Sequence, residues 1–237
     1  MKKLGPARVW LAVFLVLAGT LPASAQDLWA EHRRSMVERL RQRGITQPEV
    51  LASMEKVPRH LFVPESLRSQ AYADEVLPLG SGRTIYEPYV VALMTSLLDL
   101  QKGDKVLEVG TGSGYHAAVL ARLAREVYSV EIVPPVASQA RQRLQALGYH
   151  NIEIRVGDGY QGWSEKAPFD AILLAVAPPH IPKPLIDQLR VGGRMVVPVG
   201  GLLQDLLVIT KTEDGLEKRT VIPVKLFRMT GKVRDGR

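Results

Sequence analysis

Asp104 to Gly114 reads D-K-V-L-E-V-G-T-G-S-G, and this stretch decides the fold. A short apolar segment, Val106 to Val109, runs directly into glycines at alternate positions from Gly110 to Gly114. The apolar segment Ala117 to Ala124 that follows has helical character. Glycines at such a turn allow positive φ and let the backbone approach a ligand, which then faces N–H groups at a helix N-terminus. The pattern predicts a buried strand, a ligand-binding turn and a helix.

The loop departs from the dinucleotide pattern G-x-G-x-x-G because its third glycine comes one residue early. Glu131 closes the apolar strand Val127 to Ile132, where a carboxylate accepts from both ribose hydroxyls of a nucleoside. Glu108, just before the loop, argues against a polyphosphate by charge repulsion. S-adenosylmethionine carries a sulfonium and an ammonium and no phosphate, so the acidic loop favours it over NAD.

Asp158 lies between two glycines at the end of the next strand. An Asp between glycines is a common turn, which is one interpretation. The other follows from its position on the carboxyl edge of the sheet, where ligands of such folds bind. There its carboxylate is placed to accept from an adenine amino group.

Composition limits the function classes. The 237 residues, 46% of them hydrophobic, suit one domain or a domain with an arm. The formal charge of +7 is too diffuse to predict a nucleic-acid partner. The absence of cysteine excludes thiol catalysis, and the five scattered histidines contain no H-x-x-x-H pair, so no metal site is expected.

Met1 to Ala25 has the pattern of a secretory signal: a basic start, an apolar run and the cleavage site Ala23-Ser24-Ala25. An uncleaved membrane anchor is the rival interpretation, because the uncharged run from Val9 to Gln26 is just long enough. Pro22 and the small-residue site favour cleavage, so we expect export, a periplasmic location and a mature chain that begins at Gln26. No stable membrane association is expected after cleavage, and a monomer is expected.

Residues 26–99 are predicted to form an N-terminal helical and acceptor-loop region. Asp27 to Arg43 is an arginine-rich helix with Leu28, Met36, Val37 and Leu40 on its apolar side, and a second short helix spans Gln47 to Lys56. Four prolines then mark a loop-rich segment, Val57 to Tyr89, with few regular elements. Pro88 is expected to open a helix over Tyr89 to Leu98.

Residues 100–237 are predicted to form the cofactor-binding core. Strands are expected at Val127–Ile132, Ile152–Val156, Phe169–Val176 and Arg194–Val199, helices at Pro135–Leu147 and Pro184–Leu189, and a final antiparallel pair at Leu206–Lys211 and Leu216–Leu226. Alternating strands and helices predict right-handed crossovers and a Rossmann-like, doubly wound, mostly parallel sheet.

The chain resembles the protein-L-isoaspartate (D-aspartate) O-methyltransferase family from about Met36 to Gly231. The collinear motifs are V-P-R-H-L-F-V-P, A-Y-A-D, T-I-x-x-P-Y, L-E-V-G-T-G-S-G-Y, S-V-E-I, G-D-G-Y-x-G-W, A-P-F-D-A-I and L-x-x-G-G-R-M-V-V-P-V-G. The resemblance implies S-adenosylmethionine as methyl donor and isoaspartyl or D-aspartyl residues of damaged proteins as acceptors, with repair through a succinimide. The cofactor-binding residues implied by motif and resemblance together are Glu108, Gly110, Thr111, Gly112, Ser113, Gly114, Glu131, Ile132, Asp158, Gly159 and Gln204.

The acceptor loop, Gly82 to Tyr89, departs from the family pattern T-I-S-x-P. Tyr86 replaces the serine whose hydroxyl lies beside the substrate carboxylate, and Glu87 follows it. Tyr86 keeps a hydroxyl on a longer side chain, and Thr84 is the alternative donor, so these two are the candidate catalytic residues. If Tyr86 narrows the pocket and Glu87 repels a carboxylate, the acceptor is a different one, or the protein binds the cofactor without isoaspartyl activity. Arg228 stands where the family tends to have proline.

Other enzyme classes fit less well. A nucleic-acid amino-methyltransferase is expected to carry an N-P-P-Y-like turn, and this chain has Ala177-Pro178-Pro179-His180. No G-x-S-x-G of a serine hydrolase is present. A carboxylate acceptor is already an anion at neutral pH, so methylation needs no general base. Orientation and exclusion of water are expected to supply most of the rate acceleration.

Overall fold

The computed structural model describes residues 28–80 and 82–232. The predicted signal segment, Met1 to Ala25, lies outside them. A seven-stranded sheet forms the centre of the chain, with strand order β5-β4-β3-β6-β7-β8-β9. β3 to β7 pair in parallel, and β8 and β9 pair antiparallel at one edge. The predicted Rossmann-like, mostly parallel sheet with a final antiparallel pair is confirmed.

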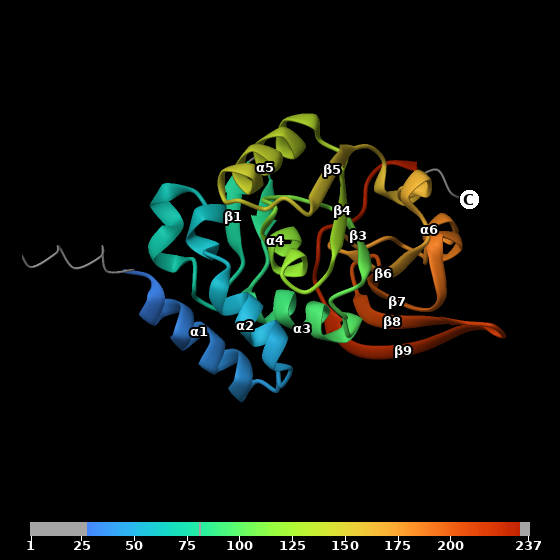
Figure 1. Cartoon of the computed structure of the whole chain (residues 1–237), viewed down its shortest axis with the longest axis horizontal. Coiled ribbons are helices and arrows are strands. Elements are labelled where there is room, and N and C mark those ends of the chain that lie inside the picture. Colours follow the sequence, from blue (N-terminus) through green and yellow to red (C-terminus); the bar gives the residue numbers. More distant parts are fainter. Residues whose placement is uncertain (1–27, 81, 233–237) are drawn as a thin grey trace, which may run out of the picture.

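The sheet strands have clear bounds. They are β3 (Lys105–Val109), β4 (Glu126–Glu131), β5 (Ile152–Val156), β6 (Phe169–Leu174), β7 (Leu189–Gly200), β8 (Gln204–Thr212) and β9 (Gly215–Val224). β7 begins five residues earlier than predicted, at the end of α6 (Lys183–Gln188). In Figure 1 the β8–β9 hairpin extends to one side, away from the N-terminal helices.

Both faces of the sheet are buried. Along β6, Ile172 and Leu174 belong to one apolar cluster, while Leu173 between them belongs to the other. Successive side chains of a strand point to opposite faces, so this alternation places apolar residues on both sides. α4 (Tyr115–Ala121) and α5 (Pro134–Ala146) complete the crossovers. α4 begins two residues earlier and ends three residues earlier than the predicted segment Ala117 to Ala124.

The N-terminal region shares one core with the sheet. It contains α1 (Ala30–Gln42), α2 (Pro48–Lys56), two 3-10 turns (Arg59–Phe62 and Glu65–Gln70), the two-stranded pair β1 (Leu77–Gly80) and β2 (Arg83–Ile85), and α3 (Pro88–Leu98). Met36 of α1 and Val106 of β3 belong to the same buried cluster. Figure 1 shows α1, α2 and β1 on the side of the sheet away from the β8–β9 hairpin, whereas α3 lies beside the base of that hairpin.

Two expectations for this region were wrong in detail. Leu28 does not join the apolar side of α1, because it precedes the helix and is 79% exposed. The loop-rich segment contains the antiparallel β1–β2 pair, in which Pro78 faces Thr84. Proline is tolerated in such a short edge strand, so the prolines concealed the strand signal. Within residues 28–80 and 82–232, no helix is long and apolar enough to cross a membrane.

Candidate active site

The glycine loop after β3 has the predicted conformation. Gly110, Gly112 and Gly114 have φ of 96°, 54° and 86°, the region that side-chain-bearing residues rarely adopt. A Cβ at Gly112 would meet nothing within 4 Å, so the backbone faces open space there. The N–H of Gly112 donates to Glu131 Oε2 at 3.0 Å, and the N–H of Val133 donates to Oε1 at 3.0 Å. These bonds fix the carboxylate at the end of β4, with further lone pairs left for ligand hydroxyls.

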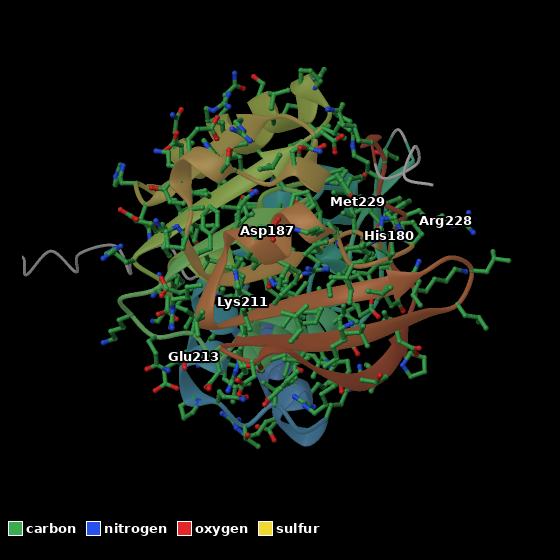
Figure 2. All side chains as sticks on the ribbon, turned by 90° about the vertical axis from the view of Figure 1, so that its right-hand side faces the viewer. His180, Asp187, Lys211, Glu213, Arg228 and Met229 are labelled. Atoms are coloured by element: carbon green, nitrogen blue, oxygen red, sulfur yellow. The ribbon has the colours of Figure 1, made fainter. Side chains whose placement is uncertain are left out.

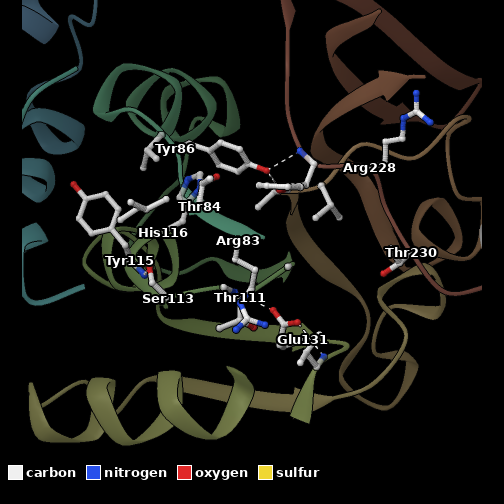
Figure 3. A pocket seen from close by; sticks show the side chains of 18 residues that line it. Arg83, Thr84, Tyr86, Thr111, Ser113, Tyr115, His116, Glu131, Arg228 and Thr230 are labelled. Carbon is white, nitrogen blue, oxygen red and sulfur yellow. Dashed lines mark hydrogen bonds between the residues drawn. The ribbon is translucent and has the colours of Figure 1, made fainter. Parts of the chain in front are cut away.

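A cavity of about 220 Å³ opens between this loop and the acceptor loop (Figure 3). Its walls come from β2 and the acceptor loop, the glycine loop with the start of α4, the ends of β4 and β6, and the C-terminal segment. The lining includes Arg83, Thr84, Tyr86, Gly110, Thr111, Gly112, Ser113, His116, Glu131, Phe227 and Arg228. The structure thus brings the loop residues, Glu131 and both candidate catalytic residues to one cavity.

A smaller cavity of about 70 Å³ adjoins the first one and shares Gly110 and Glu131 with it. Ile132 and Gly159 line it. A Cβ at Gly159 would lie 2.3 Å from Val109 Cγ1, so this position requires glycine. The combination of a carboxylate with free lone pairs and an adjoining, mostly apolar slot fits a nucleoside, with the ribose at Glu131 and the base in the slot.

Asp158 lines neither cavity. Its carboxylate accepts from the backbone N–H of Tyr160 at 3.0 Å and from that of Lys232 at 2.7 Å. These partners hold the turn after β5 and attach the C-terminal segment to it. Backbone N–H groups therefore already occupy the carboxylate oxygens that the sequence analysis assigned to the adenine amino group. The contact with adenine stays a prediction.

Glu108 is fully buried and lines neither cavity. The Ser129 hydroxyl lies 2.5 Å from Glu108 Oε2 and 2.6 Å from the hydroxyl of Thr111. Burial raises the pKa of Glu108 to about 8, so the carboxyl is mostly protonated at neutral pH. The charge-repulsion case against a polyphosphate was therefore wrong, because a protonated Glu108 carries no charge. Ser129 also contacts Thr111 of the glycine loop, so Glu108 supports that loop through Ser129.

Tyr86 is tied into the structure by its hydroxyl. The O–H donates to the carbonyl of Ala175 at 3.0 Å and accepts from the N–H of Phe227 at 3.0 Å (Figure 3). Burial raises the pKa of Tyr86 to about 12, so the phenol is protonated. The hydroxyl joins the acceptor loop to the end of β6 and to the C-terminal segment. This is a structural role, and the catalytic role expected from its place in the motif stays a prediction.

Thr84 is in the opposite situation. It lines the main cavity, and its Oγ1 is buried without a hydrogen-bond partner among the described residues. An unpartnered buried hydroxyl costs free energy that a ligand recovers by bonding to it. Glu87 does not line the cavity. The predicted repulsion of a substrate carboxylate by Glu87 therefore has no basis in the cavity wall.

Two residues of the site escaped the sequence analysis. Arg59, fully buried in V-P-R-H-L-F-V-P, donates to the carbonyls of Ala71 and Tyr86 at 2.7 and 2.6 Å and so fixes the acceptor-loop backbone. His116 follows the glycine loop, lines the cavity and is 7% exposed. Burial lowers its pKa to about 3, which keeps the ring neutral. The sequence held a signal for each of them: the arginine in the largely apolar motif V-P-R-H-L-F-V-P, and the histidine at the start of an apolar helix.

The C-terminal segment closes one wall of the cavity. Ala177 forms a parallel bridge with Arg228, through bonds from its N–H to the Phe227 carbonyl and from the Met229 N–H to its own carbonyl. Figure 2 shows Arg228 and Met229 beside His180, at the end of β8 remote from Glu213. Gln204 lines neither cavity, and its amide bonds both the N–H and the carbonyl of Leu226. Gln204 thus anchors the C-terminal segment, and its place near the cofactor stays a prediction.

Comparison with known proteins identifies the family. The model of the protein-L-isoaspartate (D-aspartate) O-methyltransferase family matches residues 31–234. The chain belongs to this family. A Picosynechococcus protein-L-isoaspartate O-methyltransferase is 52% identical over 202 residues, which cover 85% of this chain and 91% of the relative. A Synechococcus enzyme of the same name is 53% identical over 217 residues, covering 88% and 89%.

Solved structures agree with this assignment. A protein-L-isoaspartate O-methyltransferase superposes with a TM-score of 0.78 at 28% identity, covering 85% of this chain and 67% of the other. A Plasmodium falciparum protein described as a member of the same family, in complex with S-adenosyl-L-homocysteine, has a TM-score of 0.73 at 25% identity, covering 84% and 98%. The predictions of family, fold class, enzyme class and S-adenosylmethionine as cofactor are confirmed.

Proposed function

We propose that this enzyme methylates the free carboxylate of L-isoaspartyl residues in damaged proteins, with Thr84 rather than Tyr86 as the hydroxyl that orients the acceptor. Membership in the family supports the reaction, and the same family implies action on D-aspartyl residues. Two observations support the assignment of Thr84: the residue lines the cavity that the glycine loop shares, and its buried Oγ1 has no hydrogen-bond partner among the described residues.

The residues of the chain fit the cofactor. Glu131 is held by two backbone N–H groups and would accept from the ribose, the glycine loop would approach the methionine part, and Ile132 and Gly159 would enclose the base. S-adenosylmethionine supplies an electrophilic methyl group on a sulfonium. No polyphosphate-binding cation is needed for such a ligand, which agrees with a loop built only of glycine, threonine and serine.

The chain contributes orientation rather than proton transfer. An acceptor carboxylate is ionised at neutral pH, and its attack on a methyl group releases no proton from the nucleophile. A donor such as the Thr84 hydroxyl aligns one carboxylate oxygen, and the walls formed by Tyr86 and Phe227 exclude water.

The test is transfer of labelled methyl from S-adenosylmethionine to an isoaspartyl peptide, with its normal aspartyl twin as control. The chain from Gln26 onward is the enzyme, and we expect methylation of the isoaspartyl peptide alone. Thr84→Val removes the hydroxyl at constant shape, and we expect kcat/KM to fall by roughly 10- to 150-fold, the range for one hydrogen bond to a charged group. Thr84→Ser is the matched control and should retain most activity.

Other outcomes identify the alternatives. Cofactor binding without methylation of either peptide would leave a methyltransferase fold with another acceptor or a binding role. If Thr84→Val equals the parent enzyme while Tyr86→Phe loses turnover, the hydroxyl of Tyr86 is the donor instead.

We also propose that the chain is exported to the periplasm, with cleavage after Ala25. The support is the sequence pattern of Met1 to Ala25, which lies outside the described residues. Damage to aspartyl and asparaginyl residues accumulates in any long-lived protein, so an exported enzyme would act on exported proteins. Such an enzyme requires S-adenosylmethionine in the periplasm. Cell fractionation after labelling of S-adenosylmethionine tests whether the methyl donor is present there.

A further inference from the structure

His116, which lines the cavity, has one ring nitrogen that can accept a hydrogen bond. Its Nε2 lies 3.0 Å from the hydroxyl oxygen of Thr95. That hydroxyl donates its single hydrogen to the carbonyl of Val91 at 2.8 Å. Thr95 therefore accepts from the imidazole, and the ring hydrogen sits on Nε2. Nδ1 is left with a lone pair.

Nδ1 has no hydrogen-bond partner among residues 28–80 and 82–232. His116 lines the main cavity together with Thr84 (Figure 3). Because Nε2 is turned to Thr95, Nδ1 is the ring nitrogen that remains for a ligand in this cavity. The imidazole is neutral across the physiological range, so it offers an acceptor and no charge. The lining of the cavity thus includes Thr84, whose hydroxyl has no partner among the described residues, and His116, whose Nδ1 has a lone pair.

This pair matches the chemistry that separates isoaspartate from aspartate. In an isoaspartyl residue, the free carboxylate is attached to the carbon that also carries the backbone N–H. In a normal aspartyl residue, the free carboxylate is one carbon further from that N–H. A hydrogen-bond donor and an acceptor in one cavity can bind the carboxylate and the N–H of an isoaspartyl residue at the same time. They fit the wider spacing of these groups in an aspartyl residue less well.

We propose that His116 Nδ1 accepts the backbone N–H of the isoaspartyl residue while the Thr84 hydroxyl donates to its carboxylate, so that His116 is a specificity-determining residue. This inference rests on the proposed function and adds the residue that recognises the carbon bearing the carboxylate. The role needs the Nε2–H tautomer, which the bond to Thr95 enforces. Thr95 is thereby a positioning residue, because it acts through His116.

The experiment removes the proposed hydrogen bond between the isoaspartyl N–H and His116, first by changing the substrate and then by changing the enzyme. One substrate is an isoaspartyl peptide, and the other is its depsipeptide, in which an ester oxygen replaces the N–H of the isoaspartyl residue at nearly constant shape. With the full mature chain, we expect kcat/KM for the amide to exceed that for the ester by roughly 5- to 100-fold, because the ester leaves a buried acceptor unpaired. In His116→Leu the ratio should approach one. In His116→Gln, whose amide oxygen also accepts, part of the preference should return.

Each result has a defined meaning. Failure of the parent enzyme to methylate the amide peptide would refute the proposed function itself. Methylation with the same amide-to-ester ratio in the parent enzyme and in His116→Leu would overturn the role of His116 and leave the function intact. A loss of S-adenosylhomocysteine affinity in His116→Leu, measured by calorimetry, with an unchanged ratio would assign Nδ1 to the cofactor and also overturn the proposal. Circular dichroism of both variants checks that they fold, and Leu is close to His in volume, while Thr95 keeps its bond to Val91.

Discussion

Tyr86→Phe tests whether the hydroxyl of Tyr86 is structural or catalytic. The change keeps the ring, whose centroid is 6.5 Å from that of Phe227, and removes two hydrogen bonds of 3.0 Å. The carbonyl of Ala175 belongs to a residue that is only 8% exposed, so losing its donor costs about 1–3 kcal/mol. Phe227 is 43% exposed, so we expect a water molecule to accept the hydrogen bond that its N–H no longer donates to Tyr86. We expect the free energy of unfolding to fall by about 1–3 kcal/mol in total.

The assay is urea unfolding of the mature chain, followed by circular dichroism, with a thermal scan beside it. A loss of this size lowers the melting temperature by about 2–4 °C per kcal/mol for a chain of this length. Tyr128→Phe is the matched control, because the described residues give that hydroxyl no hydrogen bond while its ring packs edge-on against Trp163. The control should change stability by no more than about 0.5 kcal/mol.

Activity completes the test. At a temperature where both proteins are folded, Tyr86→Phe should keep kcat within a few-fold and raise KM for the peptide, because the C-terminal segment is held less firmly. Unchanged stability together with a loss of kcat of about a hundredfold or more would refute the structural role, since the hydroxyl would then act in the transition state.

Three further predictions concern the cofactor wall and the N-terminus. Glu131→Ala should weaken S-adenosylhomocysteine binding by roughly 1–3 kcal/mol, and calorimetry with unchanged affinity would remove Glu131 from the site. Because the pKa of Glu108 is raised from 4.5 to about 8 in the folded state, its contribution to stability is fully present below pH 4.5 and is lost as the pH rises toward 8. Glu108→Gln should reduce the dependence of the unfolding free energy on pH, measured by urea titrations at several pH values. If the variant and the parent enzyme show the same dependence, Glu108 is not protonated at neutral pH. N-terminal sequencing of the periplasmic protein should begin at Gln26, whereas intact Met1 to Ala25 in the membrane fraction would favour an anchor.

The cofactor half of the site was predictable because it is local in sequence. The glycine loop and Glu131 lie at the ends of neighbouring parallel strands, β3 and β4, and the parallel topology alone brings such ends to one edge. Positive φ at Gly112 follows from the need for a turn without a Cβ. The bond from its N–H to Glu131 then fixes the geometry between two segments whose proximity the fold already implied.

The acceptor half was not predictable to the same degree, because it is assembled from segments far apart in the chain. Thr84 comes from the β1–β2 pair, His116 from the start of α4, and Phe227 from the segment after β9. Which ring nitrogen of His116 is free depends on Thr95 of α3, and no sequence pattern connects these residues. Likewise, the neutral state of Glu108 depends on complete burial, whereas its position before a ligand loop suggested a charge.

The tyrosine in the acceptor loop shows why a motif position does not fix a role. A phenol carries its hydroxyl several ångströms beyond the point that a serine hydroxyl reaches from the same backbone. In this chain that length takes the hydroxyl of Tyr86 to the carbonyl of Ala175 and the N–H of Phe227. The loop thus gains an anchor to β6 and the C-terminal segment. The orienting hydroxyl that a serine would supply at this position then has to come from a neighbour that lines the cavity, and Thr84 is a neighbour whose buried oxygen has no hydrogen-bond partner in the described structure.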